Sequence, residues 1–290
     1  MGDAAQGEPR RHEVFSTPFK VQPAFETWST PRNYRGYPGG KDLPEQTKVW
    51  RVQKTGKDFG SVAAHSYGFE DSPDAEILTP GFNVGKESGA VGVGRHANFL
   101  QWGFSAPPSQ MTDPGKRFFL NCVCYIHRFE GNVPLIRVQS SDRLTAVHLA
   151  MLLNQIKDPK FRTNTFSPEL LAKSKGEAGA LAKCYQDDLE LIYRDKVFRV
   201  DEDLRLLGLK SNRKLETLQR LIELLGDPRQ GPAARKSLGR YTRESFETPG
   251  EWQTWFTKNR GRIFFTDVGG YKFLVRPEGY PKLTQPPRQP

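Results

Sequence analysis

The clearest pattern in the sequence is a helical spacing of apolar residues in its second half. Leucine and isoleucine recur every third or fourth position between residues 215 and 225, directly before Gly226-Asp-Pro228. Since an α-helix turns once in about 3.6 residues, this spacing places them on one face, and the Gly and Pro end the helix. Similar signals predict further helices at about 142–157, from Ser167 to about Arg194 with a break near Gly176–Gly179, at 232–238, and from Thr248.

Short runs of β-branched and aromatic residues predict strands elsewhere. These runs lie at 48–52, 75–78, 90–93, 99–104, 197–200, 262–266 and 271–275. Gly94–Asn98 and Asp267–Gly270 each separate two such runs, so both are expected to be hairpin connections. A helix is expected from Thr112, and its apolar face is predicted to contain Phe118, Phe119, Cys122, Val123 and Ile126.

These elements indicate the α/β class in its mixed α+β form. A small sheet-containing unit is followed by a mainly helical unit that a β-hairpin closes. At 290 residues, one large domain or two ordinary ones are expected. We divide the chain into an extended Pro/Gly/aromatic arm that docks through its rings (1–45), the sheet-containing unit (46–130), the basic helical unit with its hairpin (131–280) and a Pro-rich tail (281–290).

Positive charge is concentrated in the second half of the chain. Of the net charge of +10, residues 1–130 contribute 15 Lys and Arg against 14 Asp and Glu, whereas residues 131–290 contribute 28 against 19. Between Arg205 and Arg262, 13 basic residues against 6 acidic ones are interleaved with aromatic rings, as on surfaces that bind phosphates and stack bases. A solvated helical face has the same pattern, and no known nucleic-acid-binding motif is present.

The cysteines and the N-terminal residues bear on the compartment. Cys122, Cys124 and Cys184 are an odd number, so we expect buried apolar thiols and no disulfide framework. No stretch reaches the roughly 18–20 apolar residues that a membrane span needs. The N-terminus lacks the apolar core of a signal peptide, which indicates a cytoplasmic protein unless a leader has been removed.

Motifs for cofactors and catalysis are incomplete. Gly92-Val-Gly-Arg-His-Ala97 fits the letters of a dinucleotide-binding loop, but a predicted strand follows where the helix should begin. Gly85-Lys-Glu-Ser88 lacks the first Gly and the hydroxyl of a phosphate loop. The five histidines lack metal-site spacing, and no Gly-x-Ser-x-Gly elbow provides a nucleophile. We therefore expect no cofactor and no metal and assign no catalytic residue, which favours a non-enzymatic role.

Two groups of residues are candidates for binding. The polar segment with Arg95, His96 and Asn98, near Trp102, has side chains that suit an acid or a sugar, although hydrogen bonding within a hairpin turn explains the same residues. In the second half, basic and aromatic residues form a candidate interaction surface that comprises Arg240, Tyr241, Arg243, Trp252 and Trp255.

Residues 74–126 carry a family resemblance. The matching segments are Asp74–Leu78, Ala90–Arg95, Phe99–Phe104, Met111-Thr112 and Phe118–Ile126. They resemble the closing strands and last helix of trehalose-utilisation-type proteins, which have the class I glutamine-amidotransferase-like fold, a parallel sheet flanked by helices. The resemblance implies a remnant of that domain, because the chain before Asp74 is too short for the remainder. The nucleophile elbow of the family has no counterpart, so no catalytic residue is carried over.

A second set of segments lies within residues 198–275. These segments are Phe198–Asp203, Leu206–Leu209, Arg240–Thr242, Glu251–Phe256 and Arg262–Phe273. They are similar to helical segments of exported bacterial proteins of unassigned function, where they accompany varied enzymes. The resemblance implies an accessory or docking role, and it makes export an alternative to the cytoplasm.

The sequence favours a non-catalytic binding or assembly module that acts through protein–protein contact. Its contact surface would be the basic helical face and the aromatic residues of the second half. Two alternatives stay open: a hydrolase that acts on a sugar-like or acidic substrate through the Arg95/His96 loop, and a phosphate-backbone (nucleic-acid) binder that uses the basic face at 205–262. A protein is thus the first expected partner and a polyanion the second.

Overall fold

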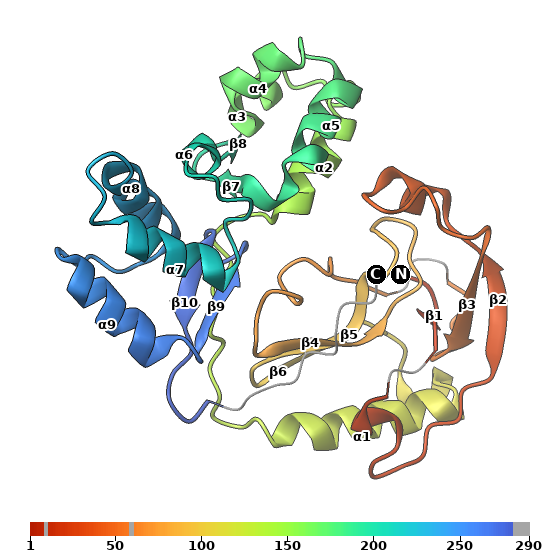
Figure 1. Cartoon of the computed structure of the whole chain (residues 1–290). Helices are drawn as coiled ribbons and strands as arrows, with labels where there is room; N and C mark the ends of the chain where they lie inside the picture. Colours follow the sequence, from red (N-terminus) through yellow and green to blue (C-terminus); the bar gives the residue numbers. More distant parts are fainter. Residues whose placement is uncertain (9–10, 58–60, 281–290) are drawn as a thin grey trace. The chain divides into compact units, whose positions relative to one another are not determined.

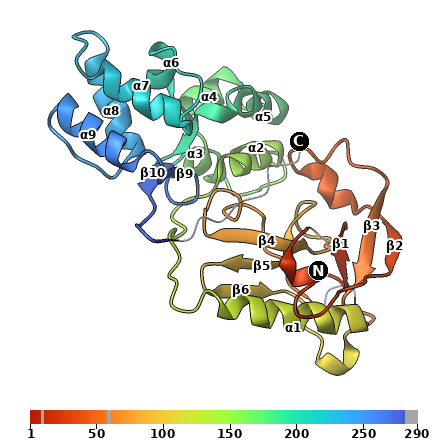
Figure 2. The ribbon, with the colours of Figure 1, turned by 60° about the horizontal axis from the view of Figure 1, so that its bottom comes forward.

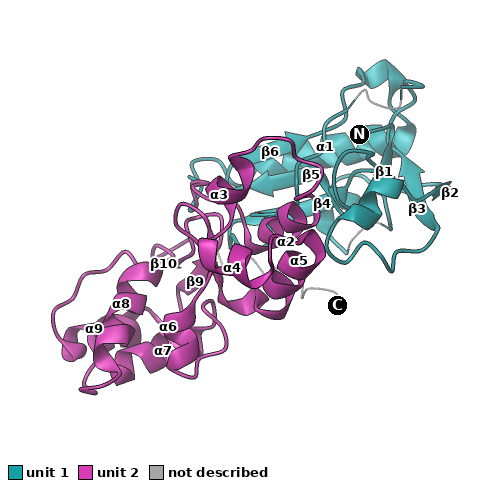
Figure 3. Cartoon of the chain, turned by 90° about the horizontal axis from the view of Figure 1, so that it is seen from above, with its two compact units in different colours: residues 1–135, 283–290 teal, residues 136–282 magenta. Residues whose placement is uncertain are grey.

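The computed structural model describes residues 1–8, 11–57 and 61–280 and divides them into two compact units. Unit 1 ends at Leu135 and unit 2 begins at Ile136 (Figure 3). Helices and strands occur together, and the sheets within the described ranges are antiparallel. The predicted mixed α+β class is therefore confirmed. The Pro-rich tail expected at 281–290 lies outside the described residues.

The first sheet of unit 1 contains strands β1 (Ala4–Gln6), β2 (Phe25–Ser29) and β3 (Gln46–Arg51), in the order β1-β3-β2 (Figure 1). The central strand, β3, was predicted at 48–52. Its Trp50 is fully buried and pairs with Ala5 on one side and Phe25 on the other. The segment expected as an extended arm thus supplies both outer strands of this sheet.

The second sheet of unit 1 contains β4 (Ala75–Pro80), β5 (Val91–His96) and β6 (Phe99–Trp102), in that order. Gly94 pairs with both neighbouring strands, so β5 continues through it to His96. The predicted hairpin is confirmed, but its connection is shorter than the expected Gly94–Asn98. Only Ala97 and Asn98 make the turn, and Ala97 has the positive φ (50°) that two-residue hairpin turns require.

Helix α1 (Asp113–His127) packs beside β6, as Figures 1 and 2 both show. It begins as predicted, because the Thr112 hydroxyl accepts a hydrogen bond from the Gly115 N–H. Its buried face contains Phe118, Cys122 and Tyr125. Val123, which was predicted on this face, is 47% exposed, so the buried face includes Tyr125 in its place.

Phe118 is the centre of the core of unit 1. Its ring centroid lies 4.8 Å from that of Phe15, 5.7 Å from that of Trp50 and 5.5 Å from that of Trp102. These four rings come from a 3-10 helix (Glu13–Phe15), β3, β6 and α1. Edge-to-face and stacked ring contacts of this kind add to the free energy that burial alone provides. They therefore join the first 45 residues to both sheets.

Unit 2 is mainly helical. Its elements are α2 (Arg143–Met151), α3 (Phe161–Thr165), α4 (Pro168–Lys173), α5 (Ala178–Asp187), β7 (Ile192–Arg194), β8 (Phe198–Val200), α6 (Glu202–Leu206), α7 (Leu215–Leu224), α8 (Gly231–Tyr241), α9 (Pro249–Asn259), β9 (Ile263–Thr266) and β10 (Lys272–Val275). The predicted hairpin, now β9 and β10, is confirmed. The helix predicted at 142–157 ends at Met151, because the next backbone bonds, such as Leu153 N–H to Ala150 C=O, follow a tighter three-residue turn.

Helix α7 organises one end of unit 2 by packing against α8 and α9. Its residues Leu218, Leu221 and Ile222 are buried, as the apolar spacing predicts. The hairpin is attached to this group through Lys272, whose Nζ donates hydrogen bonds to the carbonyl oxygens of Gly239, Arg240 and Thr242 at the end of α8. Two orphan carbonyl groups of the last turn of α8 and the carbonyl group of its C-cap, Thr242, are thereby satisfied.

The packing of α7 gives a direct test. Leu221→Ala should lower the free energy of unfolding by about 2–5 kcal/mol, because Leu221 is fully buried and its truncation leaves a cavity. Leu206→Ala, at a position 83% exposed, should change it by no more than about 0.5 kcal/mol. Urea unfolding followed by tryptophan fluorescence measures both values. Equal losses for the two variants would contradict this packing.

Candidate functional site

Arg95, a predicted ligand-binding residue, lies inside unit 1 and is 1% exposed. Its Nε donates to Oε1 of Glu76 at 2.5 Å, and its Nη1 donates to the carbonyl oxygen of Ala97 at 2.9 Å. The guanidinium carbon lies 3.9 Å from the centre of the Phe129 ring. These contacts hold β4, the 97–98 turn and the segment after α1 together. The guanidinium therefore has a structural role and is enclosed by protein.

Glu76 is the centre of a buried polar cluster around Arg95. Its carboxylate accepts a hydrogen bond from the Tyr125 hydroxyl and lies 3.4 Å from Nε2 of His12. Burial by itself would raise the pKa of Glu76, but the bonds from His12 and Tyr125 and the charge of Arg95 outweigh it and lower the pKa to about 2. Glu76 is therefore ionised at neutral pH and neutralises Arg95. No sequence pattern pointed to His12 or Glu76, because they meet only when the sheet and α1 have formed.

The other three residues of the predicted ligand site point to different surroundings. His96 Nε2 lies 3.5 Å from Oδ1 of Asp74, whose carboxylate also accepts from the Ser72 hydroxyl and the Leu135 N–H. Burial opposes ionisation of Asp74, but these donors outweigh it and lower its pKa to about 2. Asn98 is exposed in the turn. Trp102 packs into the ring cluster around Phe118. Arg95, His96 and Trp102 therefore have separate partners within unit 1.

A third histidine–carboxylate pair lies at the opposite end of β5 from His96. His65 Nδ1 is 2.5 Å from Oε2 of Glu87, and Glu87 also accepts hydrogen bonds from the N–H and hydroxyl of Ser66. Burial raises the pKa of Glu87, but the bonds from His65 and Ser66 lower it by more. The His65 ring stacks on Tyr67 with centroids 5.1 Å apart.

The His65–Glu87 and His96–Asp74 pairs are too far apart to act together. Ala64 pairs with Val91 at the start of β5, and His96 ends that strand. Five residues of extended chain separate their histidines by roughly 16 Å. A carboxylate-bound imidazole can hold a proton, but acyl transfer also requires a nucleophile within hydrogen-bond reach of the base. The Ser66 hydroxyl is directed to Glu87 instead.

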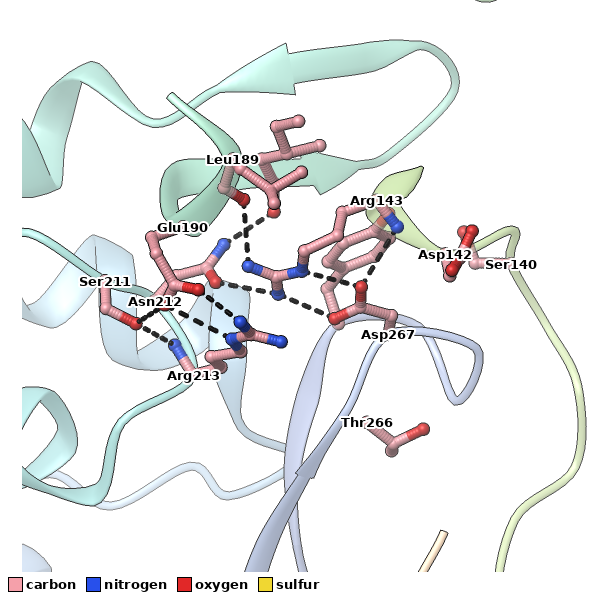
Figure 4. Close-up of polar contacts among 12 residues, drawn as sticks. Ser140, Asp142, Arg143, Leu189, Glu190, Ser211, Asn212, Arg213, Thr266 and Asp267 are labelled. Atoms are coloured by element: carbon pink, nitrogen blue, oxygen red, sulfur yellow. Dashed lines mark hydrogen bonds and ion pairs between the residues drawn. The ribbon is translucent and has the colours of Figure 1, made fainter. Parts of the chain in front are cut away.

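Unit 2 contains a buried network around Arg143 (Figure 4). The guanidinium donates two bonds to Asp267, through Nε at 2.7 Å and Nη2 at 2.6 Å. It also donates to the Asn212 side chain and the Leu189 carbonyl oxygen, so all three of its nitrogens are bound. Arg143 begins α2, and Asp267 lies in the β9–β10 turn, 124 residues later. The network therefore fixes the hairpin against α2.

Asp142, next to this network, is the N-cap of α2. Its Oδ1 accepts hydrogen bonds from the N–H and hydroxyl of Thr145. Burial raises the pKa of Asp142 to about 6, and the charge of Asp267 adds to this rise against the bonds from Thr145. Its ionisation is therefore disfavoured in the folded protein.

The predicted interaction surface in unit 2 requires correction. Tyr241 is fully buried, and Trp252 is 3% exposed, so both belong to the core. The Tyr241 hydroxyl donates to Asp201 at 2.5 Å, and Arg240 is bound to Asp201 and Asp203. Arg243 is exposed, and Trp255 is partly buried against the core. The prediction was wrong for Tyr241 and Trp252 because aromatic residues at helical spacing occur both on exposed binding faces and on faces packed into a core.

The basic stretch at 205–262 is partly neutralised within the unit. Seven of its basic side chains bind carboxylates or carbonyl oxygens: Arg205, Arg213, Arg220, Arg235, Lys236, Arg240 and Arg262. A phosphate-binding face depends on cations that are free to release counterions on binding. These internal pairs reduce the support for a phosphate-backbone binder.

Metal-binding clusters and membrane-spanning helices are both absent from the part of the chain that the structure describes. Within the described ranges, no group of three or more His, Cys, Asp or Glu side chains is arranged to hold a metal ion. None of the described helices combines the length and apolar character needed to cross a bilayer. Comparison with protein-family models, with curated proteins and with solved structures finds no match to this chain.

The raised pKa of Asp142 predicts a pH-dependent stability difference. Between about pH 4 and pH 6 the folded carboxyl holds a proton that the unfolded chain releases, so this group's stabilising contribution is lost as the pH rises through that window. Asp142→Asn keeps the cap acceptor but carries no charge. At pH 7 it should raise the free energy of unfolding by about 1–3 kcal/mol, with little difference at pH 4.

Urea titrations of wild type and variant across this pH range measure the difference. Asp142→Ala is the control for the cap: it should lose the same pH dependence but be less stable than Asp142→Asn by about 0.5–2 kcal/mol. A difference between wild type and Asp142→Asn that stays constant from pH 4 to pH 7 would refute this assignment.

Proposed function

We propose that this chain is a non-catalytic binding module that docks onto a partner protein through an apolar stripe on α1. The stripe consists of Phe119, Leu120, Val123 and Ile126. The observation that carries the proposal is the exposure of Leu120 and Val123, which are 46% and 47% exposed on the same helix. Contiguous exposed apolar side chains of this kind mark interaction sites more often than isolated ones do.

The surroundings of the stripe support a docking role. Phe119 contacts the half-buried ring of Trp102 on β6, with centroids 4.9 Å apart, so the apolar surface continues from the helix toward the sheet. In the order β4-β5-β6, β6 is the edge strand of the described sheet. Partly exposed aromatic rings beside an edge strand supply both apolar contact area and backbone hydrogen-bonding groups.

Charge indicates what the partner would present. Lys116 and Arg117 are exposed in the first turns of α1. Lys116 lies 3.6 Å from the exposed Asp113, and Arg117 donates to the Lys20 carbonyl oxygen, so Arg117 keeps an uncompensated positive charge. These cations favour a partner whose apolar surface has acidic residues at the corresponding margin, because complementary charges at a rim fix orientation and speed association.

The hydrolase alternative has less support from the geometry. Arg95 is enclosed by Glu76, Ala97 and Phe129, so its guanidinium is bound by the protein itself. Tyr241 and Trp252, two residues of the docking surface expected in unit 2, are buried in the core and are not available to a partner. The α1 stripe in unit 1 replaces it in this proposal.

A photocrosslinking amino acid at position 120 tests the stripe. In the cells that produce the protein, benzoylphenylalanine at position 120 should give one discrete protein adduct, and adding Val123→Glu should reduce that adduct at least tenfold. The same amino acid in place of Lys173, exposed on α4, is the matched control and should give no such band. Immunoblotting measures the adducts.

Folding is checked in parallel by thermal unfolding. Val123 is already solvent-exposed, so Val123→Glu should leave the melting temperature within a few degrees of wild type. Failure to obtain an adduct at position 120, or equal adducts at positions 120 and 173, would remove the basis for the proposal.

A further inference from the structure

A pocket in unit 1 shares no lining residue with the α1 stripe or with the histidine–carboxylate pairs. Its volume is about 390 Å³, and its lining includes Trp28 of β2, Arg51 of β3 and the segment Phe82–Val84. Small-molecule sites in proteins have volumes of about 300–1,000 Å³. The pocket is therefore large enough for a compact organic ligand.

The apolar wall of the pocket consists of two rings in fixed orientation. Trp28 and Phe82 are in edge-to-face contact with centroids 4.9 Å apart. The Trp28 indole N–H donates to Oε2 of Glu26 at 2.9 Å, which fixes the rotation of the ring. A flat apolar group can pack against such a wall without ordering it first, and this lowers the entropic cost of binding.

The same glutamate orients a cation at the pocket. Glu26 accepts bonds from Nε and Nη2 of Arg51, at 2.7 Å and 3.2 Å, and the guanidinium lies 5.1 Å from the Trp28 ring centre. The hydrogen bonds from Arg51 and Trp28 are the main causes that hold the pKa of Glu26 below its usual value. The bonds to Glu26 use Nε and Nη2, so Nη1 is the guanidinium nitrogen that they leave for a ligand.

A second cation is positioned by a second carboxylate. Asp3 accepts hydrogen bonds from the N–H groups of Thr55 and Gly56, at 2.7 Å and 3.0 Å, and from the Thr55 hydroxyl. Its other bond comes from the Gln53 side chain. These bonds fold the segment before Lys57 around Asp3, and Lys57, which follows directly, lines the pocket with an exposed side chain.

The distribution of donors and acceptors determines the ligand class. Both nearby carboxylates, Asp3 and Glu26, are occupied by internal donors. The lining also contains Gly2, Gly56, Asn83 and Val84. Asp3 keeps its negative charge there, but the two cations Arg51 and Lys57 outnumber it beside the wall of Trp28 and Phe82. We propose that this pocket binds a small planar aromatic anion, with its carboxylate or phosphate at Arg51 and Lys57 and its ring against Trp28 and Phe82.

Isothermal titration calorimetry with four probes tests the pocket. Adenosine monophosphate and indole-3-carboxylate combine a ring with an anion, whereas adenosine and inorganic phosphate each provide one part. At least one of the first two should bind with 1:1 stoichiometry and at least tenfold more tightly than adenosine or phosphate. Which of the two binds identifies the phosphate or the carboxylate as the anionic group.

Matched lysine variants distinguish binding in the pocket from nonspecific attraction of an anion to the positively charged surface. Lys57→Ala and Trp28→Leu should each weaken binding of that probe about tenfold, because a charge-assisted bond or a ring contact is lost. Lys54→Ala removes the same charge three residues away, outside the pocket lining, and should leave the affinity within twofold. The proposal is overturned if neither ring-bearing anion binds, or if Lys54→Ala and Lys57→Ala weaken binding equally.

Discussion

The pairing of buried guanidinium groups with carboxylates is the interaction on which both units depend. Arg95, 1% exposed, is bound to Glu76 in unit 1, and Arg143, 2% exposed, is bound to Asp267 in unit 2. A charge removed from water is tolerated only when a partner charge and further hydrogen bonds compensate for the lost hydration. Each pair joins segments that are distant in sequence, so these arginines fix the tertiary arrangement.

Much of the fold could be predicted because its signals are local. The apolar spacing of α7, the cap at Thr112 and the turn at Asp267–Gly270 are properties of short segments, and the structure contains all three elements. The connection around Gly94 was mispredicted because glycine is typical of turns, whereas here Gly94 continues β5 between two neighbouring strands. Ala97, which has the positive φ of the turn, carries no such sequence signal.

The candidate sites were harder to predict, since their chemistry depends on partners that the sequence does not place. Arg95 has the appearance of a ligand-binding residue until Glu76 and Phe129 surround it. Tyr241 and Trp252 have the spacing of an exposed aromatic face but are buried in the core of unit 2. Because these residues are enclosed within the protein, the two surfaces that we propose for binding are the apolar stripe of α1 and the pocket beside Trp28. Both depend on ordinary side chains that no motif marks.

A double-mutant cycle on Arg143 and Asp267 measures how strongly unit 2 depends on this buried pair. Each single change, Arg143→Leu or Asp267→Leu, leaves one buried charge without its partner and should lower the free energy of unfolding by about 3–5 kcal/mol. The double variant leaves neither charge, so our account predicts that its unfolding free energy in urea exceeds that of both single variants. A loss in the double variant equal to the sum of the two single losses would show that the pair is not coupled and would contradict the account.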